Sequence, residues 1–265
     1  MTIIPAVVPP LPRATTWKRD LPPRAALRWL VAGWRDLTVD PIASLSYGFI
    51  VFAVSLGIIA GLFALGWDYI LFPALAGFMV VGPGVAIGLY EKSRRIAAGE
   101  RVSLAQMIFV KPKSGGQLLF TGVLLCMLML LWMRAAIIVY ALFFGIRPFP
   151  GLNHIVPMLF ETPTGWAMLI VGTAIGGLFA AFSFAISAFS IPMLLNERVD
   201  ALTAMGTSLA LVWHNLPTML TWAAIVLSAF IISLATGLIG LIVVFPVLGH
   251  GAWHAYVAVY AHTAR

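Results

Sequence analysis

Long apolar segments without charged residues follow one another along most of the chain. No Asp, Glu, Lys or Arg occurs within residues 41–67, 69–90, 114–133, 162–196 or 201–264. A helix needs about 20 mostly apolar residues to cross the hydrocarbon core of a bilayer, and each of these segments is long enough. The pattern therefore predicts an all-α, polytopic membrane protein rather than a soluble protein with a large core.

Six transmembrane helices, arranged as three hairpins, fit these segments. We place them at about residues 41–66, 69–90, 116–145, 165–191, 217–236 and 237–261. The last two share one apolar segment, and we expect a tight turn near Thr236 and Gly237 to separate them.

A short amphipathic segment precedes each predicted hairpin. In residues 24–38 the apolar side chains fall on one helical face and the arginines elsewhere; the apolar ones are Leu27, Leu30, Val31, Trp34 and Leu37. Such spacing is typical of a helix lying in the membrane interface. Residues 103–110 and 200–213 occupy equivalent places, and each returning helix carries a proline: Pro83, Pro192 and Pro246. These features favour three copies of one unit, although prolines are also common in membrane helices in general.

The composition agrees with one membrane domain. Hydrophobic residues make up 62% of the 265 residues, and the mean hydropathy is +1.02. We predict a single six-helix domain over residues 22–265. Residues 1–21 contain several prolines and are expected to form a flexible cytoplasmic tail. The single cysteine, Cys126, lies within a predicted span and can form no disulfide within the chain.

The positive charge predicts the orientation. A net charge of +7 would suggest a nucleic-acid partner in a soluble protein. Here the basic residues flank the apolar segments, and we expect no nucleic acid. With both termini in the cytoplasm, all 16 Lys and Arg residues except Arg134 and Arg147 fall on the cytoplasmic side. This asymmetry predicts a multi-pass protein of the bacterial inner membrane with both termini inside.

Arg134 is the candidate for an intramembrane charge. Such residues usually face the interior of a bundle and form a pair, and Asp68 and Glu161 are the nearest acids in the predicted topology. An ion pair there would suit an anion site or a gate. Alternatively, the third helix ends early, Arg134 reaches the outer interface, and residues 135–145 lie flat on it.

His250 and His254 are spaced one helical turn apart in the last predicted helix. This spacing places two imidazoles on one face, as a metal or haem site could use. Two ligands from one helix do not complete a site, and hydrogen bonding beside Trp253 and Tyr256 is the simpler interpretation. We name the two histidines as cofactor candidates while expecting no cofactor, neither haem nor metal.

Small residues recur at four-residue spacing at several places, including Gly57 and Gly61, which would allow helices to approach closely. Nucleotide-binding loops, nucleophile elbows and metalloprotease motifs do not occur in the sequence. We therefore expect a protein without enzymatic activity.

Four phrases together resemble a known family. They are ALAGFMVVGPGVAIGLYEKSRRIAAGE, LLWMRAAIIVYALFFG, TPTGWAMLIVGTAIGGLFAAFSFAISAFSIPMLLNERVDALTAM and VVFPVLGHGAWHAYVAVY. They are similar to DUF2189, a family of bacterial integral membrane proteins, over residues 22–260. The resemblance implies an inner-membrane protein with several spans and no established activity. Some members are labelled cytochrome c oxidase subunit I, a label that six spans and five histidines support little.

Three hypotheses for function follow. The first is a non-catalytic accessory or scaffold subunit that associates with another membrane complex, a respiratory one included, or with copies of itself, in contact with lipid. The alternative is a small-solute or anion transporter or channel that uses Arg134. A haem- or metal-binding protein that uses His250 and His254 ranks third.

Overall fold

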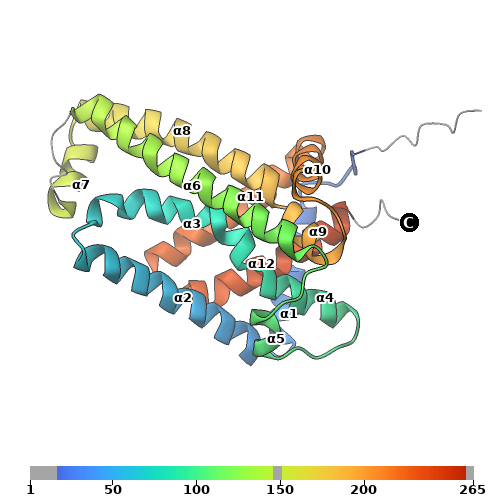
Figure 1. Cartoon of the computed structure of the whole chain (residues 1–265). Coiled ribbons are helices and arrows are strands. Elements are labelled where there is room, and N and C mark those ends of the chain that lie inside the picture. Colours follow the sequence, from blue (N-terminus) through green and yellow to red (C-terminus); the bar gives the residue numbers. More distant parts are fainter. Residues whose placement is uncertain (1–16, 146–150, 261–265) are drawn as a thin grey trace, which may run out of the picture.

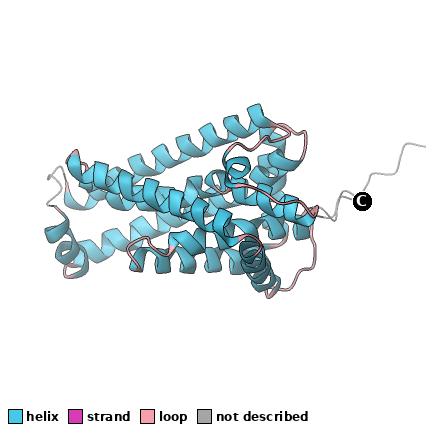
Figure 2. Ribbon diagram, turned by 90° about the horizontal axis from the view of Figure 1, so that it is seen from below, coloured by secondary structure: helices cyan, strands magenta, loops and turns pink. Residues whose placement is uncertain are grey.

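The computed structural model describes residues 17–145 and 151–260, and every regular element within them is a helix (Figures 1 and 2). The predicted tail up to Thr16, Arg147 and the last five residues lie outside the described part. The elements are α1 (Ala25–Thr38), α2 (Pro41–Ala64), η1 (Asp68–Ile70), α3 (Leu71–Val85), α4 (Ile87–Ala97), α5 (Leu104–Ile108), α6 (Gly115–Phe144), α7 (Leu152–Phe160), α8 (Pro163–Ser187), α9 (Ser190–Asn196), α10 (Ala201–His214), α11 (Leu216–Ala235) and α12 (Leu241–Val259).

Six helical segments of the described part are long and apolar enough to cross a membrane, which confirms the predicted all-α membrane fold. They are Pro41–Ala64, Asp68–Ala97, Gly115–Phe144, Pro163–Asn196, Leu216–Ala235 and Leu241–Val259. The second runs further than its uncharged segment suggests, and the fourth fills its uncharged segment, beyond the predicted end at residue 191. The second continues as α4 through Glu91 and its neighbouring arginines, because charged residues flanking a span are good helix formers.

The start of the last span differs from the sequence-based expectation. The chain turns after Thr236 through left-handed backbone at Gly237 (φ 62°) and Leu238 (φ 69°), so α12 begins at Leu241 and not at residue 237. The third span, predicted at residues 116–145, agrees with the sequence-based expectation, and the alternative in which this helix ends early near Arg134 is wrong. Helix α6 continues to Phe144, and its 30 residues give a length of about 45 Å.

Helix α12 occupies the centre of the bundle. Helices α1, α2 and α4 pack on it. In its most apolar stretch 56% of the residues are buried, against 11% in the corresponding stretches of α2 and α6. The outer helices α6 and α8 pack on one another, and α3 packs on α6 (Figure 1). Most of the side-chain surface of α2 and α6 therefore faces outward, as expected for helices surrounded by lipid.

The short helices pack in a cyclic order. Each short helix precedes one pair of spans and packs on the second span of another pair. Helix α5 packs on α4, α10 packs on α8 and α9, and α1, which precedes the first pair, packs on α12 of the last pair. The long helices follow the same order at two contacts, where α3 packs on α6 and α12 packs on α2. The third corresponding pair, α8 and α11, makes at most marginal contact among the described residues.

Helix α1 has two apolar faces with different surroundings. Leu27, Val31 and Trp34 are exposed, whereas Trp29 and Gly33 are buried against α12. A Cβ atom on Gly33 would overlap the carbonyl oxygen of Val247, so only glycine permits this crossing. The predicted amphipathic face is thus only partly the outer one, because Leu37 is buried and Leu30 packs against the core. Its position in a membrane interface stays a prediction.

Residues 17–21, which belong to the predicted tail, are fixed to the bundle. Asn215 accepts a hydrogen bond from the backbone N–H of Arg19 (2.8 Å) and donates one to the carbonyl oxygen of Trp17 (2.9 Å). Thr218 donates to the carbonyl oxygen of Leu21 (2.6 Å). The domain therefore begins before residue 22, because this segment uses polar groups of α11 and of the residue before it.

Candidate functional site: a buried polar cluster

Six polar side chains from four helices meet at one end of the bundle. This end, which we call the basic end, is formed by α1, α4, α5, α9 and α10 and lies opposite α7 (Figure 1). The group, here called the polar cluster, comprises Asp36 of α1, Ser44 of α2, Lys92 and Ser93 of α4, and His250 and His254 of α12.

Lys92 is the buried cation of the polar cluster, with only 1% of its surface exposed. Its ammonium group donates hydrogen bonds to Oγ of Ser44 (2.7 Å) and to the carbonyl oxygen of Asp40 (2.7 Å). Asp40 adopts a left-handed conformation (φ 57°) directly before Pro41. Removing an ammonium group from water is unfavourable, and these two acceptors offset part of that free energy.

His250 is completely buried, and each of its ring nitrogens has a hydroxyl group as its hydrogen-bond partner. Oγ of Ser44 lies 2.9 Å from Nε2, and Oγ of Ser93 lies 2.8 Å from Nδ1. Lysine only donates, so the Ser44 oxygen accepts from Lys92 and its proton points to Nε2. Nδ1 then carries the imidazole proton and donates to Ser93. The hydrogen-bond pattern thereby assigns the tautomer of His250.

Asp36 is the acid of the polar cluster. Its Oδ2 lies 2.9 Å from Nε2 of His254, which is partly exposed, while Asp36 itself is buried. Burial alone would raise the pKa of Asp36, but the hydrogen bonds from His254 and Ser93 outweigh burial and hold this pKa below its ordinary value of 3.8. The carboxylate is therefore charged at neutral pH and balances the charge of Lys92.

The hydrogen bonds of the polar cluster run in one direction. They lead from Lys92 through Ser44 and His250 to Ser93, and a separate hydrogen bond joins His254 to Asp36. Because every member has a partner, the polar cluster ties α1, α2 and α4 to α12. It offers no free ring nitrogen on His250 to a metal or haem, and no group of three metal-ligating side chains occurs in the described residues.

Two further ionic groups lie at the basic end. Glu91, only 2% exposed, accepts two hydrogen bonds from Arg94 (both 2.9 Å) and one from Arg95 (2.6 Å). Glu197 accepts hydrogen bonds from the hydroxyl groups of Tyr256 (3.1 Å) and Tyr260 (2.9 Å). Burial and the adjacent carboxylate raise the pKa of Tyr260 to about 12. The buried carboxylate of Glu91 and the half-buried one of Glu197 therefore both have hydrogen-bond partners within the chain.

The three intramembrane charge candidates do not come together. Arg134 is exposed on α6, and it forms no ion pair or hydrogen bond with any described residue. Asp68 begins η1 and Glu161 follows α7, at the end opposite the basic end. Arg134 is the twentieth residue of α6, about 30 Å from the start of that helix, which corresponds to the far side of a hydrocarbon core.

Sequence reasoning found His250 and His254 but missed their partners. It interprets Lys92 as one more basic residue beside a span, and it makes no prediction for Ser44 or Ser93. A usable signal exists for Asp36. It shares one helical face of α1 with Trp29 and Gly33, where a lone carboxylate needs a partner.

A scan of protein-family models matches residues 71–196. The match is to DUF2189. The family is described as a predicted integral membrane protein, and the match covers α3 to α9. The resemblance to DUF2189 is thereby confirmed for the central part of the chain. The protein is a multi-pass integral membrane protein. The DUF2189 match supports neither a bacterial origin nor the oxidase label. Comparisons with curated proteins and with solved structures found no match.

The DUF2189 segment divides the polar cluster. Lys92 and Ser93 lie inside it, whereas Asp36, Ser44 and both histidines lie outside. The cluster therefore depends on residues contributed from both sides of the matched segment.

Proposed function

We propose that the protein is a non-catalytic accessory or scaffold subunit of the bacterial inner membrane that works by binding other membrane proteins. One observation carries this proposal. The buried charges at the basic end are paired within the chain, while α2, α6 and α8 present most of their apolar surface outward. Polar groups that are fully paired offer little to a substrate, whereas long apolar helices are suited to contact with neighbouring helices and lipid.

The proposed location follows from the basic end. Lys111, Lys113, Arg101 and Arg198 belong to connections at that end, and the described segment before α1 lies there too. Cytoplasmic loops of membrane proteins carry an excess of Lys and Arg, so we assign the basic end and both termini to the cytoplasm.

Transport through Arg134 is the alternative, and it has less support. A transport site at Arg134 would require this side chain to face the inside of the bundle beside a carboxylate. Its exposed position on α6 instead suits a side chain that reaches the outer headgroups.

Purification from native membranes tests the accessory role. The chain, tagged at its N-terminus, is extracted in mild detergent after brief crosslinking, and co-purifying proteins are identified by mass spectrometry. We expect one or more membrane proteins in stoichiometric amounts, with crosslinks to the outward faces of α2, α6 or α8. Recovery of only the lone chain would contradict the proposal, whereas a homo-oligomer would limit the partner to further copies of the same chain.

A further inference from the structure

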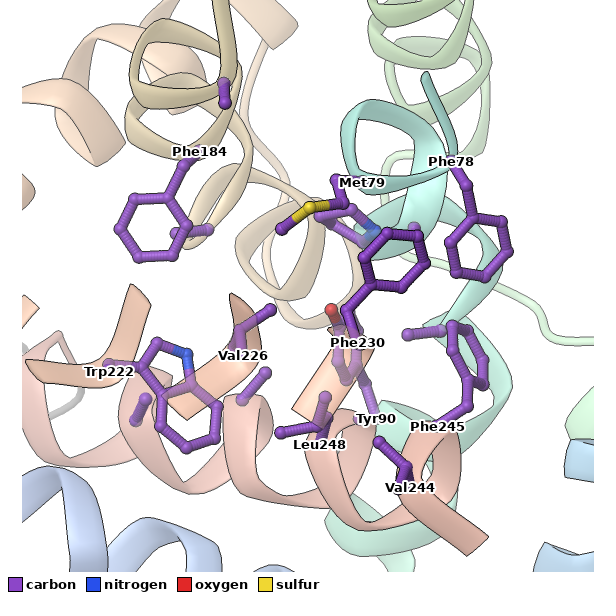
Figure 3. A pocket seen from close by; sticks show the side chains of 18 of the residues that line it. Phe78, Met79, Tyr90, Phe184, Trp222, Val226, Phe230, Val244, Phe245 and Leu248 are labelled. Atoms are coloured by element: carbon purple, nitrogen blue, oxygen red, sulfur yellow. The ribbon is translucent and has the colours of Figure 1, made fainter. Parts of the chain in front are cut away.

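A cavity of about 140 Å³ lies between α3, α8, α11 and α12 (Figure 3). Its walls are almost entirely carbon, with Phe78, Phe184, Phe230 and Leu248 among the lining side chains. An engineered apolar cavity of about 150 Å³ in another protein stays dry and takes up benzene. The present cavity can therefore hold a hydrocarbon segment of comparable size.

The cavity reaches the side of the bundle between α8 and α11. This is the helix pair that makes at most marginal contact, whereas the corresponding pairs α3–α6 and α12–α2 pack closely. Ala180 of α8 both lines the cavity and is exposed. Since α8 and α11 are spans, the surroundings of this opening are the bilayer, and a lipid chain can enter from the side.

Two hydrogen-bond donors line the cavity without a partner in the described part of the chain. Tyr90 is 2% exposed, and its hydroxyl group points into the cavity in Figure 3. Trp222 is 3% exposed, and the nitrogen of its indole lies on the cavity side of the ring. Because neither group has a hydrogen bond within the described residues, an acceptor inside the cavity would add a hydrogen bond to each.

We propose that this cavity binds a membrane lipid, holding its apolar chain against the aromatic walls while a carbonyl oxygen accepts hydrogen bonds from Tyr90 and Trp222. Tyr90 directly precedes Glu91, whose ion pairs mark the basic end. The hydroxyl group therefore lies near the depth at which ester groups meet the hydrocarbon core. Acyl esters and isoprenoid quinones both combine a carbonyl with a long apolar chain. The inference goes beyond the accessory role and does not depend on a protein partner.

Photolabelling of the full-length protein tests the site. The probe is a phosphatidylglycerol with a diazirine in one acyl chain, incorporated into nanodiscs with the protein, and labelled residues are mapped by mass spectrometry. We expect labelling at Val226 and Leu248, which line the cavity. Ala180→Phe should reduce this labelling at least fivefold by closing the opening. Ala181→Phe, at an exposed neighbour that does not line the cavity, should leave it unchanged.

Tyr90→Phe keeps the cavity shape and removes the hydroxyl group, so cavity labelling should fall about fivefold, as expected for one lost hydrogen bond.

Two competitors then distinguish the lipid classes: methyl decanoate and a decyl-substituted benzoquinone. Displacement by the ester alone identifies acyl lipids, by the quinone alone identifies quinones, and by both supports the shared carbonyl chemistry. Labelling that neither competitor reduces, or that Ala180→Phe leaves unchanged, overturns the proposal, and equal displacement by decane overturns the role of Tyr90.

Discussion

Ser44 and His250 are 206 positions apart in the sequence, and a 2.9 Å hydrogen bond joins Oγ of the first to Nε2 of the second. Ser44 also accepts the hydrogen bond of the Lys92 ammonium group. One hydroxyl group thus links the first span, the second span and the last span. A single substitution at Ser44 therefore removes two hydrogen bonds of the polar cluster and tests its role.

Ser44→Ala should destabilise the protein by about 1–3 kcal/mol, because it leaves a buried ammonium group and a buried imidazole nitrogen each without one partner. The measurement is the thermal unfolding midpoint of the purified protein in detergent. Ser46→Ala, in the same helix but without a hydrogen bond in the described structure, is the matched control and should change little. Equal midpoints for the two variants would contradict a stabilising role of the polar cluster.

The stability of the protein should fall in acid because of Asp36. The pKa of this carboxyl group is lowered in the folded state, so its contribution is fully present above its unfolded pKa and is lost as the pH falls through the folded value. The decline is therefore expected below about pH 4. Asp36→Asn should lower the unfolding midpoint at neutral pH, and the difference from the unmodified protein should shrink between pH 5 and pH 3. A difference that stays constant over this range would exclude Asp36 as the source.

Gly33→Ala should weaken the attachment of α1. A methyl group at this position would overlap the carbonyl oxygen of Val247, so α1 has to move away from α12. We expect a lower unfolding midpoint and faster proteolysis within α1. Gly57→Ala in α2 is the control, because a Cβ atom there meets no neighbour within 4 Å, and alanine favours a helix over glycine. Faster proteolysis in both variants would point to a general loss of stability.

Arg134→Leu should leave folding and stability unchanged within about 0.5 kcal/mol, because the exposed guanidinium group has no partner among the described residues. Membrane insertion of the third span should improve, since leucine enters the hydrocarbon core far more readily than arginine. Unfolding midpoints and a glycosylation-based insertion assay provide the two measurements. A marked loss of stability would reveal an ion pair that forms only in the membrane.

The proposed orientation is open to a direct test with thiol reagents. In a background with Cys126→Ser, Asn153→Cys should react with an impermeant maleimide in intact spheroplasts, because α7 lies opposite the basic end. Lys111→Cys should react only after the membrane is permeabilised. The reverse labelling pattern would invert the assignment of the two sides.

The spans could be predicted because their signal is local. Charged residues such as Asp40, Asp68 and Glu91 stand at the borders of apolar segments long enough to cross a bilayer, and this spacing requires no knowledge of tertiary contacts. The boundaries were less accurate where helices continue through charged residues, as α4 does after Glu91.

The polar cluster could not be predicted because its members are distant in sequence and ordinary in type. A serine in a span is usually satisfied by its own helix, and nothing local reveals that Ser44 faces α12. The small-residue contacts show the same difficulty. Gly57 and Gly61 have the expected spacing but face open space, whereas Gly33 and Gly251 form the close contact between α1 and α12.

The central position of α12 has a consequence for biosynthesis. The ribosome makes this helix after α1, α2 and α4, yet all three pack on it. Until α12 enters the membrane, Lys92 has no His250 nearby and α1 has no surface to dock on. The earlier helices therefore acquire these contacts only after α12 has been synthesised, so the packing of α1 on α12 is a late step in the assembly of the bundle.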